Sequence, residues 1–327
     1  MNQSVCHLRP GDLVEVLRPS EIAALLDEDG KTGGLPFMPE MLAHCGRRYR
    51  VLRRAAKTCV EGSPDGIRRF PDDDVVLLDS LRCGGEAHDG CGRACLFFWK
   101  LCWLRPVIPD EAAPDAGDPS LAREAEALRS RLITRRSDGR YVCQSSELPG
   151  ATAYLSPGGR LLTCAKDVLA GTYSPMRMVR LIVHPLWSKL KEQFVDRYPR
   201  TAATRTPTQV LGLQPGEWVR IKSLPEITAT LDGEARNRGL QFSHDLAPQC
   251  GRRFRVRSRL DRMIIEGTGE MVAMKNTVLL EGALCPCQQV VGGCPRLDHI
   301  YWREIWLERV PPPEGGAAPT TPEPGQR

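Results

Sequence analysis

The chain has 327 residues, of which 41% are hydrophobic and 26% charged, and its formal net charge is +5, which fits a soluble globular protein of two or three domains. No apolar run reaches the about 18 residues that would indicate a membrane span, and the first residues lack the basic and apolar regions of a secretion signal. We therefore expect a cytoplasmic protein without a membrane partner. Its 13 cysteines are then reduced, and they serve as metal ligands or buried thiols rather than disulfides.

The first module begins near residue 8, and its elements can be predicted in chain order. A strand, a short helix and a helical turn are followed by three further strands; the residues are 13–17, 20–27, 38–42, 49–52, 75–78 and 97–104. Short strands at this spacing, with one helix, predict a small SH3-like or partly open barrel.

A second copy of this module follows later in the chain. Positions 11–55 match positions 216–260 without a gap, and the string CGRRYRV at 45–51 returns as CGRRFRV. The spacing of one cysteine and two tryptophans also returns; these residues are Cys91, Trp99 and Trp103, and then Cys294, Trp302 and Trp306. The offset between the copies changes only in loops, as a tandem duplication predicts. We place the modules at 8–107 and 211–310.

The segment between the modules has a different composition. Residues 108–118 are a linker rich in Pro, Ala and Asp, and residues 119–210 are predicted to form a mostly helical insert domain. After the second module, the Pro- and Gly-rich tail at 311–327 is predicted to be disordered. The predicted fold class is mixed and mainly β, with two duplicated barrel modules and a helical insert.

Within the insert, residues 119–136 and 175–195 have apolar residues at helical spacing. The segments on either side of Pro157-Gly158-Gly159 favour a short hairpin, which would place Cys143 and Cys164 across from each other. A redox role for these two thiols is not expected, because they lack the CxxC spacing.

The cysteines of the modules predict a metal site in each copy. Four thiols of the first copy can complete a tetrahedral zinc shell, and they are Cys45, Cys83, Cys91 and Cys95. Glycines beside them allow a tight turn around an ion. The second copy keeps three of these thiols, Cys250, Cys285 and Cys294, and we expect His299 as its fourth ligand, with Asp298 and Cys287 as alternatives. Zinc is the expected metal, and an iron–sulfur cluster or Cu(I) is the alternative. The alternative without a metal is that these cysteines are buried thiols of the core.

Arginines and tryptophans also recur in both copies. The arginines are candidates for binding an anion, and they are Arg47, Arg48, Arg50, Arg252, Arg253 and Arg255. The alternative is that they pair with carboxylates of their own module. The tryptophan pairs at i and i+4 are expected to anchor each core, with a stacking platform for bases or sugars as the alternative. Lys100, Arg303 and Glu304 would lie on the opposite, exposed face.

One string of the first copy resembles a known pattern. Residues 81–100 fit LRCxGxAHxGCxxxCLxFWK, and with GLPFMPEM at 34–41 they resemble a bacterial family of Cys- and Trp-rich proteins that has no assigned activity. The resemblance covers nearly all of 11–107 and, more weakly, 216–310. It implies that His88 and Lys57-Thr58-Cys59 belong to the site region of the first copy.

No GxSxG, Walker loop, HExxH, or GxGxxG after a strand occurs in the chain. We therefore expect a zinc-stabilised, non-enzymatic binding or scaffold protein whose partner is another protein. Two alternatives stay open. The first is a nucleic-acid-binding protein that uses the arginine-rich strands. The second is a metal-dependent enzyme with an open site in the second module, where Asp298 and His299 would act.

Overall fold

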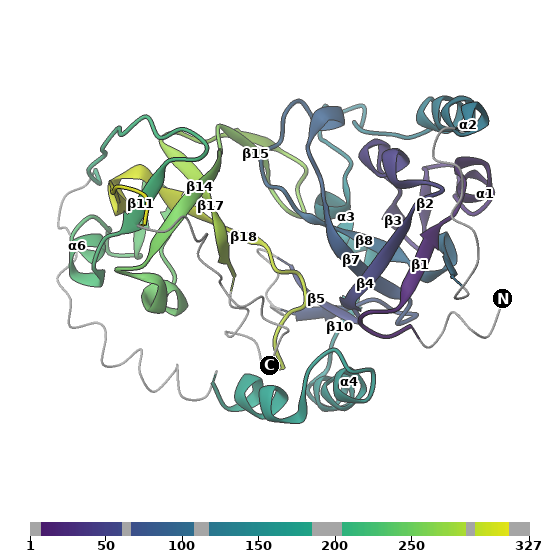
Figure 1. Ribbon diagram of the computed structural model, residues 1–327, viewed down its shortest axis with the longest axis horizontal. Helices are drawn as coiled ribbons and strands as arrows, with labels where there is room; N and C mark the ends of the chain where they lie inside the picture. Colours follow the sequence, from purple (N-terminus) through teal and green to yellow (C-terminus); the bar gives the residue numbers. More distant parts are fainter. Residues whose placement is uncertain (1–7, 61–66, 108–117, 185–204, 286–291, 314–327) are drawn as a thin grey trace. The chain divides into compact units, whose positions relative to one another are not determined.

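The computed structural model describes residues 8–60, 67–107, 118–184, 205–285 and 292–313, which fall into two compact units (Figure 1). Unit 1 comprises Met1–Val179, Ile264–Val272 and Cys294–Arg296, and unit 2 comprises Arg180–Met263, Ala273–Gly293 and Leu297–Arg327. Unit 1 thus contains the first module, most of the predicted insert and two short segments of the second copy. The predicted linker and tail lie almost entirely outside the described residues.

The first module is built on an antiparallel sheet of five strands in the order β8-β7-β4-β1-β9 (Figure 1). In chain order these strands are β1 (Leu13–Val16), β4 (Arg48–Arg54), β7 (Val75–Arg82), β8 (Leu96–Lys100) and β9 (Leu104–Pro106). Bulges in the pairings of β7 with β4 and β8 let the sheet curl into a half-barrel. The smaller elements are α1 (Pro19–Ala23), β2 (Lys31–Thr32), β3 (Leu35–Pro36), η2 (Pro39–His44), β5 (Lys57–Cys59), β6 (Ile67–Arg69), η3 (Glu86–His88) and η4 (Leu101–Trp103).

The second copy repeats this sheet in unit 2, with the order β18-β17-β14-β11-β19. Its strands are β11 (Trp218–Ile221), β14 (Arg253–Arg259), β17 (Thr277–Leu284), β18 (His299–Arg303) and β19 (Leu307–Arg309). The smaller elements are α6 (Leu224–Thr228), β12 (Arg236–Asn237), β13 (Leu240–Gln241), η5 (His244–Gln249), β15 (Arg262–Ile264), β16 (Met271–Ala273) and η6 (Glu304–Trp306). The matching strand order confirms the two-module, mainly β prediction.

The repeated tryptophans anchor the module cores, as the sequence predicts. Trp99 and Trp103 are fully buried, and so are their counterparts in the second copy. Phe37 packs edge-to-face on Trp103 with ring centroids 5.3 Å apart. The predicted continuous strand at 97–104 is wrong, because the single turn η4 separates β8 from β9. This turn redirects the chain so that β9 can pair with β1 at the other edge of the sheet.

The expected exposure of Lys100, Arg303 and Glu304 is also wrong, since their exposed fractions are 1%, 8% and 0%. Each side chain has polar partners inside its module, which offsets the loss of water. Glu304, for example, accepts hydrogen bonds from three successive backbone N–H groups, those of residues 211–213, at 2.6 to 3.0 Å.

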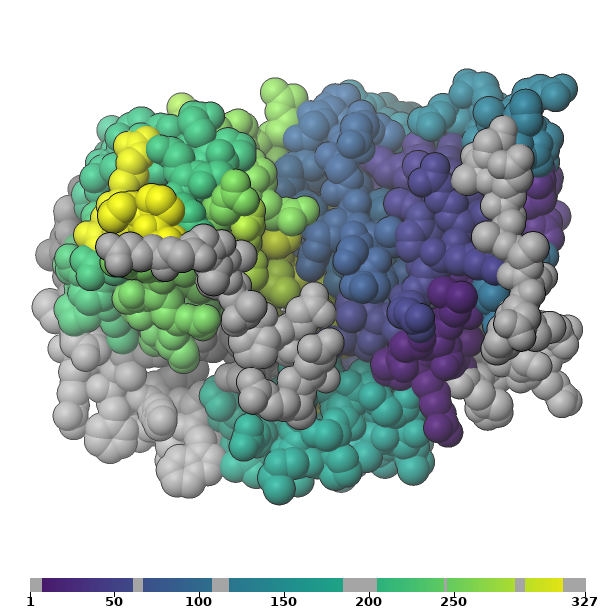
Figure 2. Space-filling model, in the orientation of Figure 1, coloured from purple at the N-terminus to yellow at the C-terminus, as the bar shows by residue number. Residues whose placement is uncertain are grey.

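The described part of the predicted insert contains α2 (Pro119–Arg129), α3 (Gln144–Ala151), β10 (Ala153–Tyr154) and α4 (Pro157–Leu169). The expected hairpin is wrong, because α4 begins where its turn was placed. Ser156 caps this helix by accepting a hydrogen bond from the Gly159 N–H at 3.2 Å, and Pro157 is the first helical residue, where its missing N–H is not needed. The surface of α4, teal in Figure 2, exposes Leu161, Leu162 and Leu169.

Candidate thiol centre in unit 1

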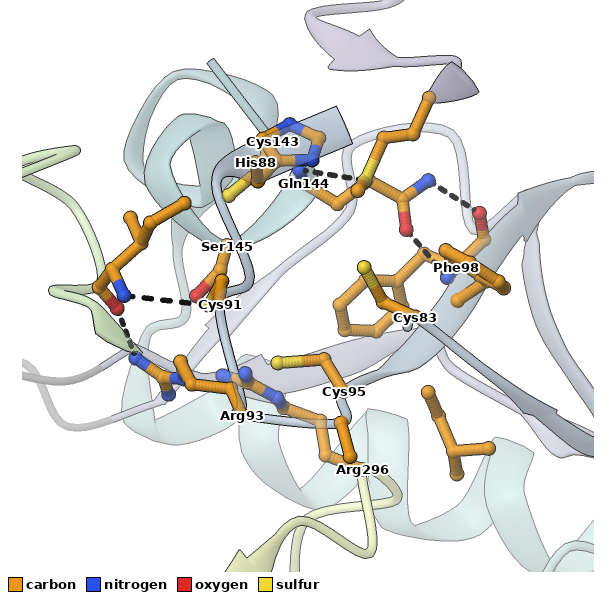
Figure 3. Close-up of a pocket in the computed structure, with 15 residues that line it drawn as sticks. Cys83, His88, Cys91, Arg93, Cys95, Phe98, Cys143, Gln144, Ser145 and Arg296 are labelled. Atoms are coloured by element: carbon orange, nitrogen blue, oxygen red, sulfur yellow. Dashed lines mark hydrogen bonds between the residues drawn. The ribbon is translucent and has the colours of Figure 1, made fainter. Parts of the chain in front are cut away.

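Four thiols line one cavity of unit 1, which we call the thiol cavity (Figure 3). Cys83, Cys91 and Cys95 come from the loop between β7 and β8, and Cys143 comes from the start of α3. The cavity volume is about 30 Å³. A single water needs about 10–15 Å³, so this space holds more than one water. Most of the remaining lining is apolar and includes Phe98.

The loop backbone explains how its three thiols reach one place. The Cys83 N–H donates to the Cys95 carbonyl at 2.8 Å, which closes the loop at its base. Gly85 has a φ of +79°, and a Cβ there would lie 2.2 Å from the Cys91 carbonyl oxygen. Only glycine allows this close approach and this backbone conformation. The glycine-rich spacing between the cysteines is therefore what folds the loop around the cavity.

Cys143 reaches the cavity because it caps α3. Its Sγ accepts a hydrogen bond from the Ser146 N–H at 3.4 Å, while its own N–H donates to the Ser146 Oγ at 2.9 Å. The next residue, Gln144, fixes the helix to β8, with its Oε1 accepting from the Phe98 N–H at 2.9 Å and its Nε2 donating to the Phe98 carbonyl at 2.8 Å. Sequence reasoning missed Cys143 as a cavity residue, because its capping box with Ser146 lacks the usual Ser or Thr followed three residues later by Glu or Gln.

The sulfurs of Cys83, Cys91 and Cys143 accept backbone hydrogen bonds. The Ile264 N–H donates to Cys91 Sγ at 3.4 Å, and Gly85 donates a backbone hydrogen bond to Cys83. Together with the bond from Ser146 to Cys143, these contacts favour the negatively charged form of sulfur.

Burial acts in the opposite direction. Desolvation raises the pKa of Cys83 well above that of a solvated thiol, and the neighbouring Cys95 adds to this effect. Desolvation also raises the pKa of Cys143, and the nearby Cys91 contributes in the same sense. A metal ion in the cavity would favour the thiolate forms that burial disfavours.

His88 lines the same cavity but both of its nitrogens are engaged elsewhere. Its Nδ1 lies 2.7 Å from Glu40 Oε1, and its Nε2 lies 3.0 Å from the Val142 carbonyl. Both partners accept hydrogen bonds, which favours the positively charged imidazole. Desolvation opposes this charge, but the hydrogen bond and the charge of Glu40 outweigh it and raise the pKa of His88. The histidine thus braces the loop against η2 and the segment before α3.

A short segment of the second copy completes the cavity wall. Ile264 stands in the sequence where the first copy has Cys59. Its N–H donates to Cys91 Sγ, and its carbonyl accepts from Arg93 Nη1 at 3.0 Å. Cys91 and Arg93 of the Cys-x-Arg run therefore bind the backbone N–H and the backbone carbonyl of Ile264.

The equivalent run of the second copy, Cys294-Pro295-Arg296, holds Cys59 in the same way. The Cys59 N–H donates to Cys294 Sγ at 3.3 Å, and its carbonyl accepts from Arg296 Nη1 at 3.0 Å. The two Sγ atoms are 3.2 Å apart. Buried Glu266 joins the two runs, since it lies within 3.2 Å of both Arg93 and Arg296. The recurrence of Cys91 as Cys294 therefore has a structural role that spacing alone did not predict.

The other predicted ligands lie elsewhere. Cys45 follows η2, where burial raises its pKa to about 12, and it is not among the residues that line the thiol cavity. Cys250 and Cys285 pack against the core of unit 2, whereas Cys294 belongs to unit 1. His299 is buried in β18, and Cys287 lies outside the described residues. Among the residues described, no three His, Cys, Asp or Glu side chains are grouped as the ligands of one metal ion.

The candidate anion-binding arginines lie on or next to β4 and β14, and several contact their own module. Arg48 Nε is 3.3 Å from Glu15 Oε2, and Arg50 donates to the Gly11 carbonyl at 2.9 Å. Arg255 lies 3.8 Å from Glu281, and Arg252 stacks on Phe254. The two carboxylate contacts lower the positive potential that these arginines present to an outside anion. Anion binding by the full set, which also contains Arg47 and Arg253, stays a prediction.

Comparison with known proteins gives no relative: no family model matches the chain, and no curated protein and no solved structure is significantly similar to it. None of the helices in the described ranges is long and apolar enough to cross a bilayer. Function therefore has to be inferred from the sites themselves.

Proposed function

We propose that this protein is a non-enzymatic binding protein whose first unit is organised by a thiolate-bound metal centre. The ligands are Cys83, Cys91, Cys95 and Cys143. One observation carries the proposal: four thiols from two distant segments of the chain line one small cavity. In this proposal the two modules are SH3-like barrels, and their partner is a protein.

A metal centre would explain two polar features of the cavity that packing of apolar side chains does not explain. Backbone N–H groups are directed at three of the sulfurs, and the lining carries two basic side chains, Arg93 and Arg296, close to them. Both features stabilise a negatively charged thiolate centre. Such a centre would tie the β7–β8 loop to α3, so it would supply folding energy to unit 1.

The arrangement favours an iron–sulfur cluster over the single zinc ion expected from spacing. Zinc draws four sulfurs to about 2.3 Å from one point, whereas a cluster holds its thiolates apart on separate irons. The described thiols surround the cavity, and no three of them are grouped for one ion. Four thiolate ligands leave no open position for a substrate, which supports a non-enzymatic role.

A protein partner is supported by the apolar surface of unit 1. Leu161, Leu162 and Leu169 of α4 are more than half exposed, at 63%, 62% and 80%. Neighbouring exposed apolar side chains of this kind mark interaction surfaces more often than single ones do.

Metal analysis of the intact protein, purified without oxygen, tests the proposal. We expect iron and acid-labile sulfide with visible absorption, lost when Cys95→Ser removes one ligand. The matched control is Cys102→Ser, which removes a thiol of the same module that does not line the cavity and should retain the metal. One zinc per chain that is lost in Cys95→Ser would support the proposed ligands and identify the metal as zinc. A folded chain without any metal would refute the proposal.

A further inference from the structure

Unit 2 contains a second pocket, of about 170 Å³, which we call the cationic pocket. Four basic residues line it, and they are Arg205, Arg238, Lys275 and Arg303. Uncharged polar side chains, including Thr208 and Asn276, line the remainder, and no Asp or Glu is among its described lining residues. Like charges gathered around a cavity repel each other unless an anion lies between them.

Arg303 shows that the charge is buried and incompletely satisfied. Its exposed fraction is 8%, and its guanidinium donates to the carbonyls of Lys275 at 2.7 Å and Arg238 at 3.0 Å. Its Nε has no hydrogen-bond partner among the described residues. Burial and the nearby Arg238 lower the pKa of Arg303, but a guanidinium stays charged at neutral pH. The pocket therefore holds a desolvated positive charge whose acceptors are neutral.

The first module resolves the same problem with a carboxylate. Lys100 occupies the position of Arg303 at the end of its strand, and its Nζ lies 2.9 and 3.1 Å from the two Asp74 oxygens. The second copy has Asn276 in place of Asp74. The backbone contacts establish this equivalence, because the Asp74 carbonyl accepts from residue 101 at 2.7 Å and the Asn276 carbonyl accepts from residue 304 at 2.8 Å. The second copy has thus lost the counter-ion and kept the buried cation.

Two further differences act in the same direction. Gly33 of the first copy stands where the second has Arg238, and Asp73 stands where the second has Lys275. Four positions of the first copy are thus compared with the second, and they hold Gly33, Asp73, Asp74 and Lys100. One lysine against two aspartates gives them a net charge of +1 − 2 = −1. The second copy carries three cations and one asparagine, a net charge of +3. Arg238 and Lys275 are exposed, and both line the same pocket as buried Arg303.

We infer that the cationic pocket binds the phosphate group of a small molecule. Guanidinium groups match phosphate oxygens in shape and charge, and three arginines with one lysine exceed what a single carboxylate would neutralise. Pockets that hold drug-sized ligands measure about 300–1,000 Å³. The smaller pocket therefore suits a phosphate or diphosphate group with little else. This inference is independent of the metal centre, which lies in unit 1.

Isothermal titration of the full-length protein with inorganic phosphate and with pyrophosphate tests the inference, with sodium chloride at matched ionic strength as the reference. We expect saturable binding, tighter for pyrophosphate if the natural ligand carries a diphosphate and equal for both if it carries a single phosphate. Asn276→Asp, which restores the carboxylate of the first copy, should weaken binding about tenfold or more. The same substitution should raise the melting temperature without ligand, because it neutralises Arg303.

Lys275→Gln provides a second test, since it removes one pocket charge without adding a carboxylate. Arg257→Gln is the matched control, because Arg257 is an exposed residue of β14 that does not line the pocket. Weaker binding in Lys275→Gln with unchanged binding in Arg257→Gln supports the pocket. Equal weakening in both variants would assign the effect to net charge and overturn the inference. Absence of saturable binding to the native protein at millimolar phosphate or pyrophosphate would overturn it as well.

Discussion

The buried side chain of Gln144 allows a direct test of how the thiol cavity is assembled. This glutamine is 4% exposed, and its amide pairs with both the N–H and the carbonyl of Phe98. In Gln144→Leu both backbone groups lose their partner inside unit 1. Each unsatisfied buried group costs about 1–3 kcal/mol. The added apolar burial of leucine returns about 1 kcal/mol, so we expect a net loss of about 3 kcal/mol.

Hydrogen exchange followed by mass spectrometry is the appropriate assay, because it reports on β8 rather than on the whole chain. A loss of about 3 kcal/mol corresponds to roughly a hundredfold faster exchange in peptides that contain Phe98. The metal content should fall as well, because Gln144 holds the helix that carries Cys143.

Gln241→Leu is the matched control, since Gln241 is exposed in β13 and its substitution should change stability by less than about 0.5 kcal/mol. Unchanged protection of β8 from hydrogen exchange in Gln144→Leu would show that the glutamine does not fix α3 to the sheet.

Three further predictions follow from buried charges and thiols of unit 1. Lys57→Met should lower the free energy of unfolding, measured by denaturant titration, by about 3–5 kcal/mol. The reason is that Asp167, which lies 2.8 Å from Lys57 Nζ in the native protein, stays buried without its cation. Adding Asp167→Leu should restore most of this loss. Glu266→Ala should lower the melting temperature of unit 1 more than Glu266→Gln does, since only the glutamine can still accept hydrogen bonds from the two buried arginines. Burial raises the pKa of Cys45 from 9.0 to about 12. The free energy of unfolding that this shift contributes is therefore complete below pH 9.0 and is lost as the pH rises toward 12. Cys45→Ala should flatten the free energy of unfolding as a function of pH over this range.

Most of the module fold could be predicted from the sequence. The duplication, the main strands and the buried tryptophans all leave periodic or repeated patterns, and the structure confirms them. The turn between Trp99 and Trp103 could not be predicted, because a single helical turn keeps an i, i+4 pair on one side just as a strand does. The predicted hairpin in the insert is wrong because proline suits a first helical position as well as a turn, and Pro157 begins α4.

The candidate sites were predicted less well, for a physical reason. Spacing within one segment brought Cys83, Cys91 and Cys95 together correctly, but it could not show that Cys143 comes from a different element. Recurrence of a residue in both copies has a second explanation here, because Cys91 and Cys294 accept equivalent backbone hydrogen bonds. The sequence does not predict the cationic pocket, because it places Lys100 and Arg303 on an exposed face. Partners distant in sequence decide whether a charge can be buried.

We propose that a metal is bound by the thiols that line the cavity, and not by the set that spacing within one copy indicates. Metal per folded chain, measured side by side in Cys143→Ser and Cys45→Ser, tests this most directly, with circular dichroism confirming that each variant folds. We predict that Cys143→Ser loses most of the metal and that Cys45→Ser keeps it, because only Cys143 lines the thiol cavity. Loss of metal in Cys45→Ser with full retention in Cys143→Ser would contradict the account.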